Sequence, residues 1–259
     1  MGADGLLCRA ADWILRARHL VALTGAGVST PSGIPDFRSP DSGLWNRVNP
    51  FLAASIVAFR IRPQLFFDWI RPLANMMLDA VPNAAHLALA QLEQMGRLQT
   101  LITQNIDNLH QKAGSTRVIE LHGTMRHATC VRCHHVMPTA PLLPRFLATG
   151  ELPRCDTCGG VMKPDVILFG EQLPVQEVDA ARAAAGACDV MLVLGSSLTV
   201  APAADLPAIA CDNGARVIVI NRQDTWIDDR AALVIHDDVA KTLPDIVARV
   251  ACGTQAPVE

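Results

Sequence analysis

Four cysteines stand in two pairs whose spacing is that of metal ligands. Cys130 and Cys133 form one Cys-x-x-Cys pair, Cys155 and Cys158 form the other, and 21 residues separate the pairs. Two such pairs can bring four thiolates into a tetrahedron around Zn²⁺, and four protein ligands leave no position for a reactive water. The spacing therefore predicts one structural zinc ion. A redox dithiol or unliganded surface cysteines are the alternatives.

A glycine turn follows the first apolar run of the chain. Residues 20–23 lead into Gly-Ala-Gly at 25–27, the arrangement that lets backbone N–H groups approach a pyrophosphate. A dehydrogenase needs a third Gly or Ala near position 30 and an acid at the end of a second strand. Position 30 is Thr, and Asp36 follows prolines in a loop. The turn therefore predicts dinucleotide binding without hydride transfer.

Polar side chains follow two further expected strands. Asn105 and Asp107 come after the strand that ends at Thr103, and they could recognise a carboxamide, although turn and capping duty is equally open. His122 comes at the end of the next strand, where it could act as a general base or be a structural residue. Ligands of open α/β sheets bind at this carboxyl edge.

Two more strand ends and one extended run complete the candidate residues. A strand is expected to end before Gly195-Ser196-Ser197, and a helix is expected to begin there. The N-terminus of that helix would suit phosphate or ribose oxygens. Asn221 ends the next strand, where a simple turn is the alternative. The apolar run 165–169 behind Pro164 could be an ordinary buried strand.

These sequence motifs resemble those of the sirtuins, a family of NAD-dependent protein deacylases. The resemblance rests on residues 25–38, ending in Pro-Asp-Phe-Arg, on Thr-Gln-Asn-Ile-Asp at 103–107, on residues 118–123 and on residues 163–171. The motifs follow the order of the family and extend from about residue 11 to residue 250. The family more often has Arg than Lys at position 163.

The resemblance implies a set of roles. His122 and Asn105 would be catalytic, with His122 acting as base on the ribose hydroxyls of NAD. Ile167 and Phe169 would contact the acyl-lysine, and the substrate backbone would pair beside them as an added strand. The residues implied to contact NAD are Gly25, Ala26, Gly27, Asp36, Phe37, Arg38, Gln104, Asn105, Ile106, Asp107, Gly195, Ser196, Ser197, Asn221, Arg222, Asp238 and Val239.

The implied activity is NAD-dependent deacetylation of lysine in protein substrates, releasing nicotinamide and O-acetyl-ADP-ribose. Relatives that prefer succinyl or malonyl groups use a Tyr-x-x-Arg pair, and this chain contains no Tyr. The corresponding positions are Phe67 and Ile70, with Arg71 one residue beyond, so acetyl or other neutral acyl groups are expected. A mono-ADP-ribosyltransferase, a dehydrogenase and a non-enzymatic zinc-ribbon adaptor are the rival classes.

The elements that must position these residues alternate along the chain. Strands are expected at 20–23, 101–103, 118–121, 190–194, 216–220 and 233–236, and helices at 6–18, 50–80, 84–95, 176–187, 201–212 and 239–251. Alternation predicts an α/β fold with a Rossmann-like parallel sheet and helices on both faces. Residues 1–45, 82–125 and 162–259 would form this NAD-binding domain, 46–81 a helical insert, and 126–161 a small inserted zinc-ribbon module.

Composition excludes several classes of partner. The net charge is −3, and no basic cluster with interleaved aromatics accompanies the cysteines, so no nucleic-acid partner is expected. No stretch of about 18 apolar residues is present, so no membrane span is expected. The start of the chain lacks the basic region of a signal peptide, and the paired cysteines favour a reducing compartment. A cytoplasmic location is therefore expected.

Overall fold

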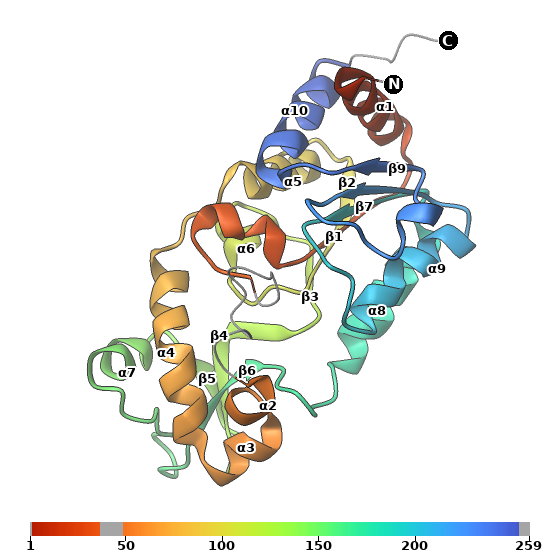
Figure 1. Ribbon diagram of the computed structural model, residues 1–259. Coiled ribbons are helices and arrows are strands. Elements are labelled where there is room, and N and C mark those ends of the chain that lie inside the picture. Colours follow the sequence, from red (N-terminus) through yellow and green to blue (C-terminus); the bar gives the residue numbers. More distant parts are fainter. Residues whose placement is uncertain (1, 37–48, 254–259) are drawn as a thin grey trace.

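A six-stranded parallel sheet forms the centre of the larger part of the molecule (Figure 1). The computed structural model describes residues 2–36 and 49–253. The strands of the sheet are β1 (Leu20–Thr24), β2 (Leu98–Thr103), β3 (Val118–Glu120), β7 (Val190–Leu194), β8 (Arg216–Ile220) and β9 (Leu233–Ile235). Their spatial order is β3-β2-β1-β7-β8-β9, the order of a Rossmann sheet. The chain order reverses between β1 and β7, which makes their carboxyl ends the expected ligand crevice.

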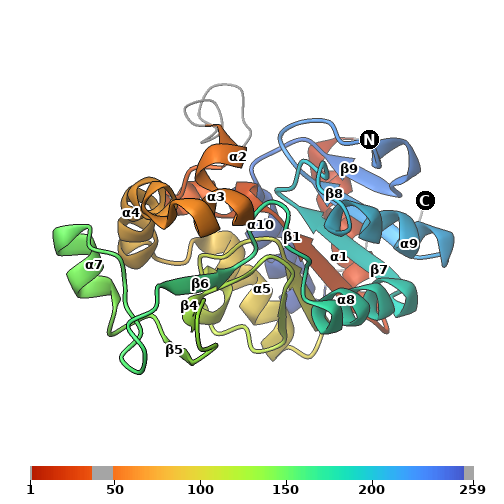
Figure 2. The same cartoon turned by 90° about the horizontal axis from the view of Figure 1, so that it is seen from below.

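Helices cover both faces of this sheet, as the sequence predicts. Helices α1 (Ala3–Arg16), α5 (Ala84–Gln94) and α10 (Val239–Ala251) pack on one face, and α8 (Val175–Ala187) and α9 (Leu206–Asp212) on the other (Figure 2). Every residue of β1 and β7 is buried, which explains why these strands are continuous apolar runs. Asn83 caps α5 through its side chain.

A smaller region lies beside the sheet. It contains an antiparallel sheet of β4 (Gly123–Cys130), β5 (Val136–Pro138) and β6 (Met162–Val166), in the order β5-β4-β6. Four helices belong to it: α2 (Pro50–Ala53), α3 (Ile56–Ile61), α4 (Pro63–Asp79) and α7 (Leu143–Thr149). An aromatic core that includes Phe59, Phe66, Phe67 and Phe146 joins α3, α4 and α7 to β6. Residues 50–80, where one helix is expected, therefore form three helices, whose aromatic side chains Phe59, Phe66 and Phe67 are packed in this core.

One expected helix start is wrong. No helix begins at Ser196. Residues 196–202 form a loop instead, in which Leu198 has a positive φ of 50°. A 3₁₀ turn at Ala203–Asp205 precedes α9. The domain boundaries expected from the sequence stay a prediction, and the strands β4 and β6 reach beyond residues 126–161 on both sides.

Candidate functional site

The glycine turn and the end of β7 touch each other through their backbones. Gly25 N donates to Leu194 O at 3.0 Å, and Gly27 N donates to Gly195 O at 2.8 Å. A Cβ at Gly27 would lie 2.8 Å from Gly195 O, and one at Gly195 would lie 2.5 Å from Val28 N. Only glycines allow this approach, so the turn sits at the sheet crevice where a pyrophosphate would bind.

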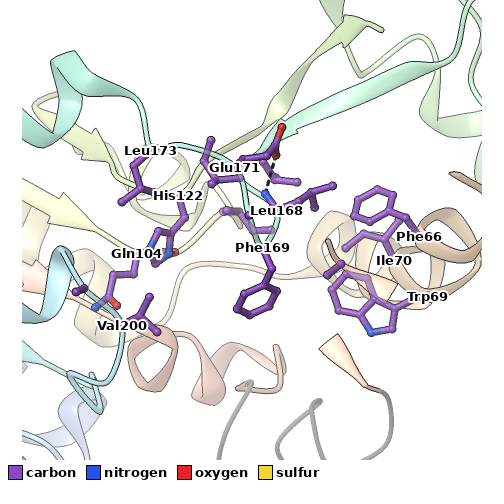
Figure 3. A pocket seen from close by; sticks show the side chains of 16 residues that line it. Phe66, Trp69, Ile70, Gln104, His122, Leu168, Phe169, Glu171, Leu173 and Val200 are labelled. Carbon is purple, nitrogen blue, oxygen red and sulfur yellow. Dashed lines mark hydrogen bonds between the residues drawn. The ribbon is translucent and has the colours of Figure 1, made fainter. Parts of the chain in front are cut away.

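A cleft of about 260 Å³ opens between the two parts of the molecule (Figure 3). Gln104, Ile106 and His122 line it from the side of the large sheet. Ile167 and Phe169 line it from the segment after β6. The cleft is further lined by apolar side chains, including Ala54, Phe66, Trp69, Ile70, Leu168 and Val200. It therefore combines one imidazole with a mostly apolar wall, which suits a neutral acyl chain.

The orientation of His122 is set by a backbone carbonyl. Its Nδ1 lies 2.9 Å from Gln104 O, which can only accept, so Nδ1 carries a proton. In the neutral imidazole Nε2 is then the basic nitrogen. Gln104 itself is fixed by its N–H on Thr24 O at 3.0 Å and by Nε2 on Ser196 Oγ at 2.9 Å. The geometry thus prepares His122 to accept a proton at Nε2.

A buried polar network lies beside this cleft. Ser29 Oγ donates to Asp107 Oδ2 at 2.7 Å and accepts from Asn105 Nδ2 at 3.1 Å. Asp107 Oδ1 also accepts from Leu109 N at 2.9 Å, which begins α6 (Leu109–Lys112). Asp107 therefore combines a capping duty with a fixed orientation, and Asn105 is held toward Ser29 and Gly25 O.

The network also includes two residues, Ser29 and His86, to which the sequence motifs alone assign no role. Ser29 lies within the motif at residues 25–38, and His86 lies in the first turn of α5. His86 is fully buried, its Nδ1 accepts from Asn83 N at 3.3 Å, and its Nε2 faces Ser29 Oγ at 3.4 Å. Burial lowers the pKa of His86 to about 4, against an opposing effect of Asp107. The local sequence signal for the orientation of His86 is its position three residues after Asn83, the cap of α5.

The side chains expected at the adenosine end of NAD are engaged mainly in contacts with nearby residues of the chain. Ser197 Oγ lies 3.2 Å from Thr199 Oγ1. Asn221 Nδ2 donates to Gln223 O at 2.7 Å, which is the simple turn left open by the sequence. Asp238 caps α10 and pairs with Arg222 at 2.8 Å, and although burial opposes it, donation from Ala240 N and Arg222 lowers the pKa of Asp238. The side chain of Val239 is buried in the core, so its backbone is the part that could meet a ligand.

Three residues at the start of the loop after the glycine turn remain as predictions. Asp36 is the last described residue before the gap, and Phe37 and Arg38 lie outside the described residues.

The structure brings the four paired cysteines together. The Sγ atoms of Cys130 and Cys158 are 3.5 Å apart, those of Cys133 and Cys155 3.7 Å, and those of Cys133 and Cys158 3.4 Å. These distances exceed the roughly 2.05 Å of a disulfide. They approach the edge of about 3.8 Å that a tetrahedron with Zn–S bonds of about 2.3 Å requires. The cluster therefore fits a structural zinc site without an open coordination position.

The sheet order, the glycine turn at its crevice and the four-cysteine module define a nucleotide-binding α/β protein with a structural metal site. The Sir2 family model matches residues 25–202. The NAD-dependent protein deacetylase of Caldivirga maquilingensis is 46% identical over 248 residues, which cover 96% of this chain and 95% of that relative. The NAD-dependent protein deacylase 2 of Archaeoglobus fulgidus is 43% identical over 243 residues, 93% of this chain and 95% of that relative.

Solved structures of Sir2 proteins are also similar to this chain. One described as "Structural Basis for the Mechanism and Regulation of Sir2 Enzymes" matches with a TM-score of 0.90 and 42% identity, over 98% of this chain and 100% of the other. Another, described as "Sir2-p53 peptide-NAD+", matches with a TM-score of 0.84 and 39% identity, over 93% and 97%. The chain belongs to the Sir2 family, the sirtuins.

Proposed function

We propose that this chain is an NAD-dependent protein-lysine deacetylase that releases nicotinamide and O-acetyl-ADP-ribose. The observation that supports it most strongly is the cleft in which His122 faces the segment of Ile167 and Phe169. Relatives that cover nearly the whole chain are named NAD-dependent protein deacetylases. A similar protein has been solved with a p53 peptide and NAD⁺. The proposed substrates are accordingly proteins that carry acetyl-lysine.

The proposed NAD site is the crevice between β1 and β7. The 25–27 turn and the Gly195 backbone would face the pyrophosphate, with Asp36, Phe37, Arg38, Ser196 and Ser197 nearby in the sequence motifs. Asn105 and Asp107 would hold the nicotinamide end, and Asn221, Arg222, Asp238 and Val239 the adenosine end. When NAD is bound, it supplies the ADP-ribosyl group that accepts the acetyl group and the nicotinamide that leaves.

The work of this chain's own residues follows from their positions. His122 Nε2 would take a proton from a ribose hydroxyl, because Nδ1 is already committed to Gln104 O. Asn105 would orient the groups around the reacting centre from its fixed position beside Ser29. Ile167 and Phe169 would hold the acyl-lysine stem, and the apolar wall would exclude water from the reaction.

The preference for a neutral acyl group is supported by Arg71. Its Nε and Nη2 donate to Leu147 O, and Nη2 also donates to Ala148 O at 3.0 Å, near the carboxyl end of α7. Its guanidinium is therefore engaged on α7, whereas Ile70 lines the cleft at the position of the acid-binding Arg. We expect acetyl removal to exceed succinyl removal.

Mass spectrometry of an acetyl-lysine peptide, with and without NAD, tests the proposal. The expected result is NAD-dependent loss of acetyl with formation of nicotinamide and O-acetyl-ADP-ribose. His122→Ala should lower the rate by about 10²–10⁴-fold, and His127→Ala, at an exposed histidine, should not. An unchanged peptide with labelled protein would instead support ADP-ribosyl transfer, and NADH formation would support a dehydrogenase. Absence of any NAD consumption would support the adaptor class.

Two expectations about partners and location stay predictions. Within residues 2–36 and 49–253, the structure contains no helix with the length and apolar character needed to cross a membrane. The absence of a nucleic-acid partner and a cytoplasmic location remain proposals drawn from charge and cysteine usage.

A further inference from the structure

An ion pair joins the two ends of the segment that lines the cleft, and its carboxylate partner, Glu171, is itself part of the lining. Lys163 Nζ is 3.0 Å from Glu171 Oε2, and the two side chains are only 13% and 21% exposed. By contrast, the Arg145–Glu151 pair lies on the surface, with side chains that are 77% and 55% exposed. Exposed pairs of that kind contribute little to structure, whereas a largely buried pair is costly to break because one charge is left uncompensated.

Both partners of the pair also hold the backbone between them. Lys163 Nζ donates to Val166 O at 2.9 Å and to Pro164 O at 3.3 Å. Glu171 Oε2 accepts from Leu168 N at 2.8 Å, and Glu171 N donates to Leu168 O at 2.9 Å (Figure 3). The ion pair therefore fixes the chain immediately before and immediately after Ile167.

The fixed segment bridges the two walls of the cleft. Ile167 N donates to His122 O at 2.9 Å, on the side of the large sheet. Phe169 N donates to Ala54 O at 2.8 Å, and Ile56 N donates to Phe169 O at 3.0 Å, on the side of α3. A shift of this segment would move the side chains of Ile167 and Phe169, which face the proposed acyl-lysine, without touching the glycine turn.

We propose that the Lys163–Glu171 ion pair is a positioning device that sets the affinity of the cleft for the acylated peptide and leaves that for NAD unchanged. Glu171 also lines the cleft, but the role proposed for both side chains is exerted through the backbone of residues 166–169, so they are positioning residues. The inference rests on the proposed deacetylase function. It also explains how Lys can stand where the family more often has Arg, because the role requires a cation that donates to carbonyls and to Glu171.

Steady-state kinetics with an acetyl-lysine peptide test the proposal. Glu171→Gln and Lys163→Met should each raise the KM for the peptide by about tenfold, because each leaves a largely buried charge unpaired beside the segment. The KM for NAD should change by less than about twofold, so it can be distinguished from the tenfold change in the KM for the peptide. Lys163→Arg, which keeps the cation that Lys163→Met removes, should leave the KM for the peptide near the wild-type value. Glu151→Gln, the same change in the exposed pair, should have no effect.

Three outcomes would overturn the proposal. Unchanged peptide KM in both Glu171→Gln and Lys163→Met would show that the pair does not position the segment. Parallel changes in the KM for NAD and in kcat would show a general structural role, as would failure of Lys163→Arg to rescue. These results are distinguishable from failure of the proposed function, since in that case the wild-type protein itself would not deacetylate the peptide.

Discussion

His86 and His110 are neutral side chains enclosed behind the cleft. Their rings lie 4.8 Å apart between centroids, and both are buried. Burial lowers the pKa of His86 to about 4, and burial followed by the neighbouring His86 lowers the pKa of His110 to about 3. His110 Nε2 lies 3.0 Å from Thr24 Oγ1, so both rings serve as uncharged hydrogen-bonding groups. Their protonation would place charge in a buried network.

Stability should therefore fall as the pH falls from 7 to 5. In the unfolded chain a histidine takes up a proton near pH 6.5, whereas folded His86 and His110 do so only near pH 4 and pH 3. Between those values the unfolded state binds more protons, so the free energy of unfolding rises with pH. The loss at pH 5 is about 2 kcal/mol for each histidine. Urea denaturation at pH 5, 6 and 7 measures it.

Variants separate this effect from that of other groups. His86→Gln and His110→Gln should each flatten the dependence of unfolding free energy on pH, even if they lower its value at pH 7. His127→Gln, at an exposed histidine, should leave the dependence unchanged. Equal slopes in all four proteins would contradict the assignment of the pH dependence to the buried pair.

Ile70 offers a test of acyl preference. It is buried in the aromatic core of the small region and also lines the cleft. Ile70→Arg should lower deacetylation and raise desuccinylation, so that the ratio of kcat/KM values shifts toward the acidic acyl group by at least about tenfold, the effect of a single charge-assisted hydrogen bond. Acetyl and succinyl peptides of one sequence measure the ratio. Arg71→Lys is the control, since this side chain is engaged on α7; a shift in that variant alone would contradict the proposal.

At the scale of elements, the junction between the glycine turn and the end of β7 leaves no room for a side chain. Gly195 has a φ of +55°, and a Cβ there would lie 2.5 Å from Val28 N and 2.6 Å from Gly27 C. Gly195→Ala should therefore cost about 3 kcal/mol of unfolding free energy, from overpacking and the left-handed backbone together. It should also raise the KM for NAD.

A matched control separates the two causes. Gly214 has a φ of +82° and would place its Cβ in open space. Gly214→Ala should cost only about 1 kcal/mol, the backbone cost alone, with no effect on NAD. Thermal unfolding and NAD kinetics of both variants provide the measurement. Equal destabilisation by the two would mean that the close approach to the turn carries no cost.

The elements most accurately predicted from sequence are the buried ones. The strands at Val190–Leu194 and Arg216–Ile220 and the helix at Val239–Ala251 have the bounds that their apolar patterns predict. The helix expected at Ser196 fails because small hydroxyl residues suit a loop as well as a helix start. Ser196 Oγ accepts from Leu198 N at 3.2 Å, which stabilises the loop instead.

The site was less accessible to sequence reasoning than the fold. The types of His122, Asn105 and the paired cysteines indicated chemistry at their own positions. Contacts between distant segments gave no such signal. Ser29 meets His86 across 57 positions of sequence, and Lys163 meets Glu171 across a loop whose path no local pattern specifies. The contact of Ser29 with His86 becomes visible only after the fold brings their segments together, and that of Lys163 with Glu171 only once the path of residues 163–171 is known.

At the scale of the whole molecule, the metal module and the cleft share one antiparallel sheet. Cys130 ends β4 and is paired in register with Met162 at the start of β6. The chain leaves β6 at Val166 and enters the cleft as Ile167, whose N–H is bonded to His122 O. The zinc cluster is therefore connected to the cleft by one strand pair, although it contributes no group to the chemistry.

Removal of zinc should consequently reduce deacetylation strongly, although zinc takes no part in the reaction. Metal analysis of the purified protein should find one zinc per chain, and Cys130→Ala should lose it. Because a structural zinc contributes about 10 kcal/mol or more to folding of its module, the β4–β6 pairing and the segment at Ile167 should become disordered. The KM for the peptide should rise and kcat should fall by at least about a hundredfold as the substrate wall is lost.

The large sheet gives this prediction its discriminating control. NAD would contact the crevice between β1 and β7, whose strands and helices form their own core. NAD binding, measured by calorimetry, should therefore survive in Cys130→Ala within about tenfold, the equivalent of 1.4 kcal/mol. Cys252→Ala, at an exposed cysteine outside the cluster, should retain zinc and activity. Full deacetylase activity in a zinc-free protein would show that the sheet of β4 and β6 holds the cleft in place without the metal.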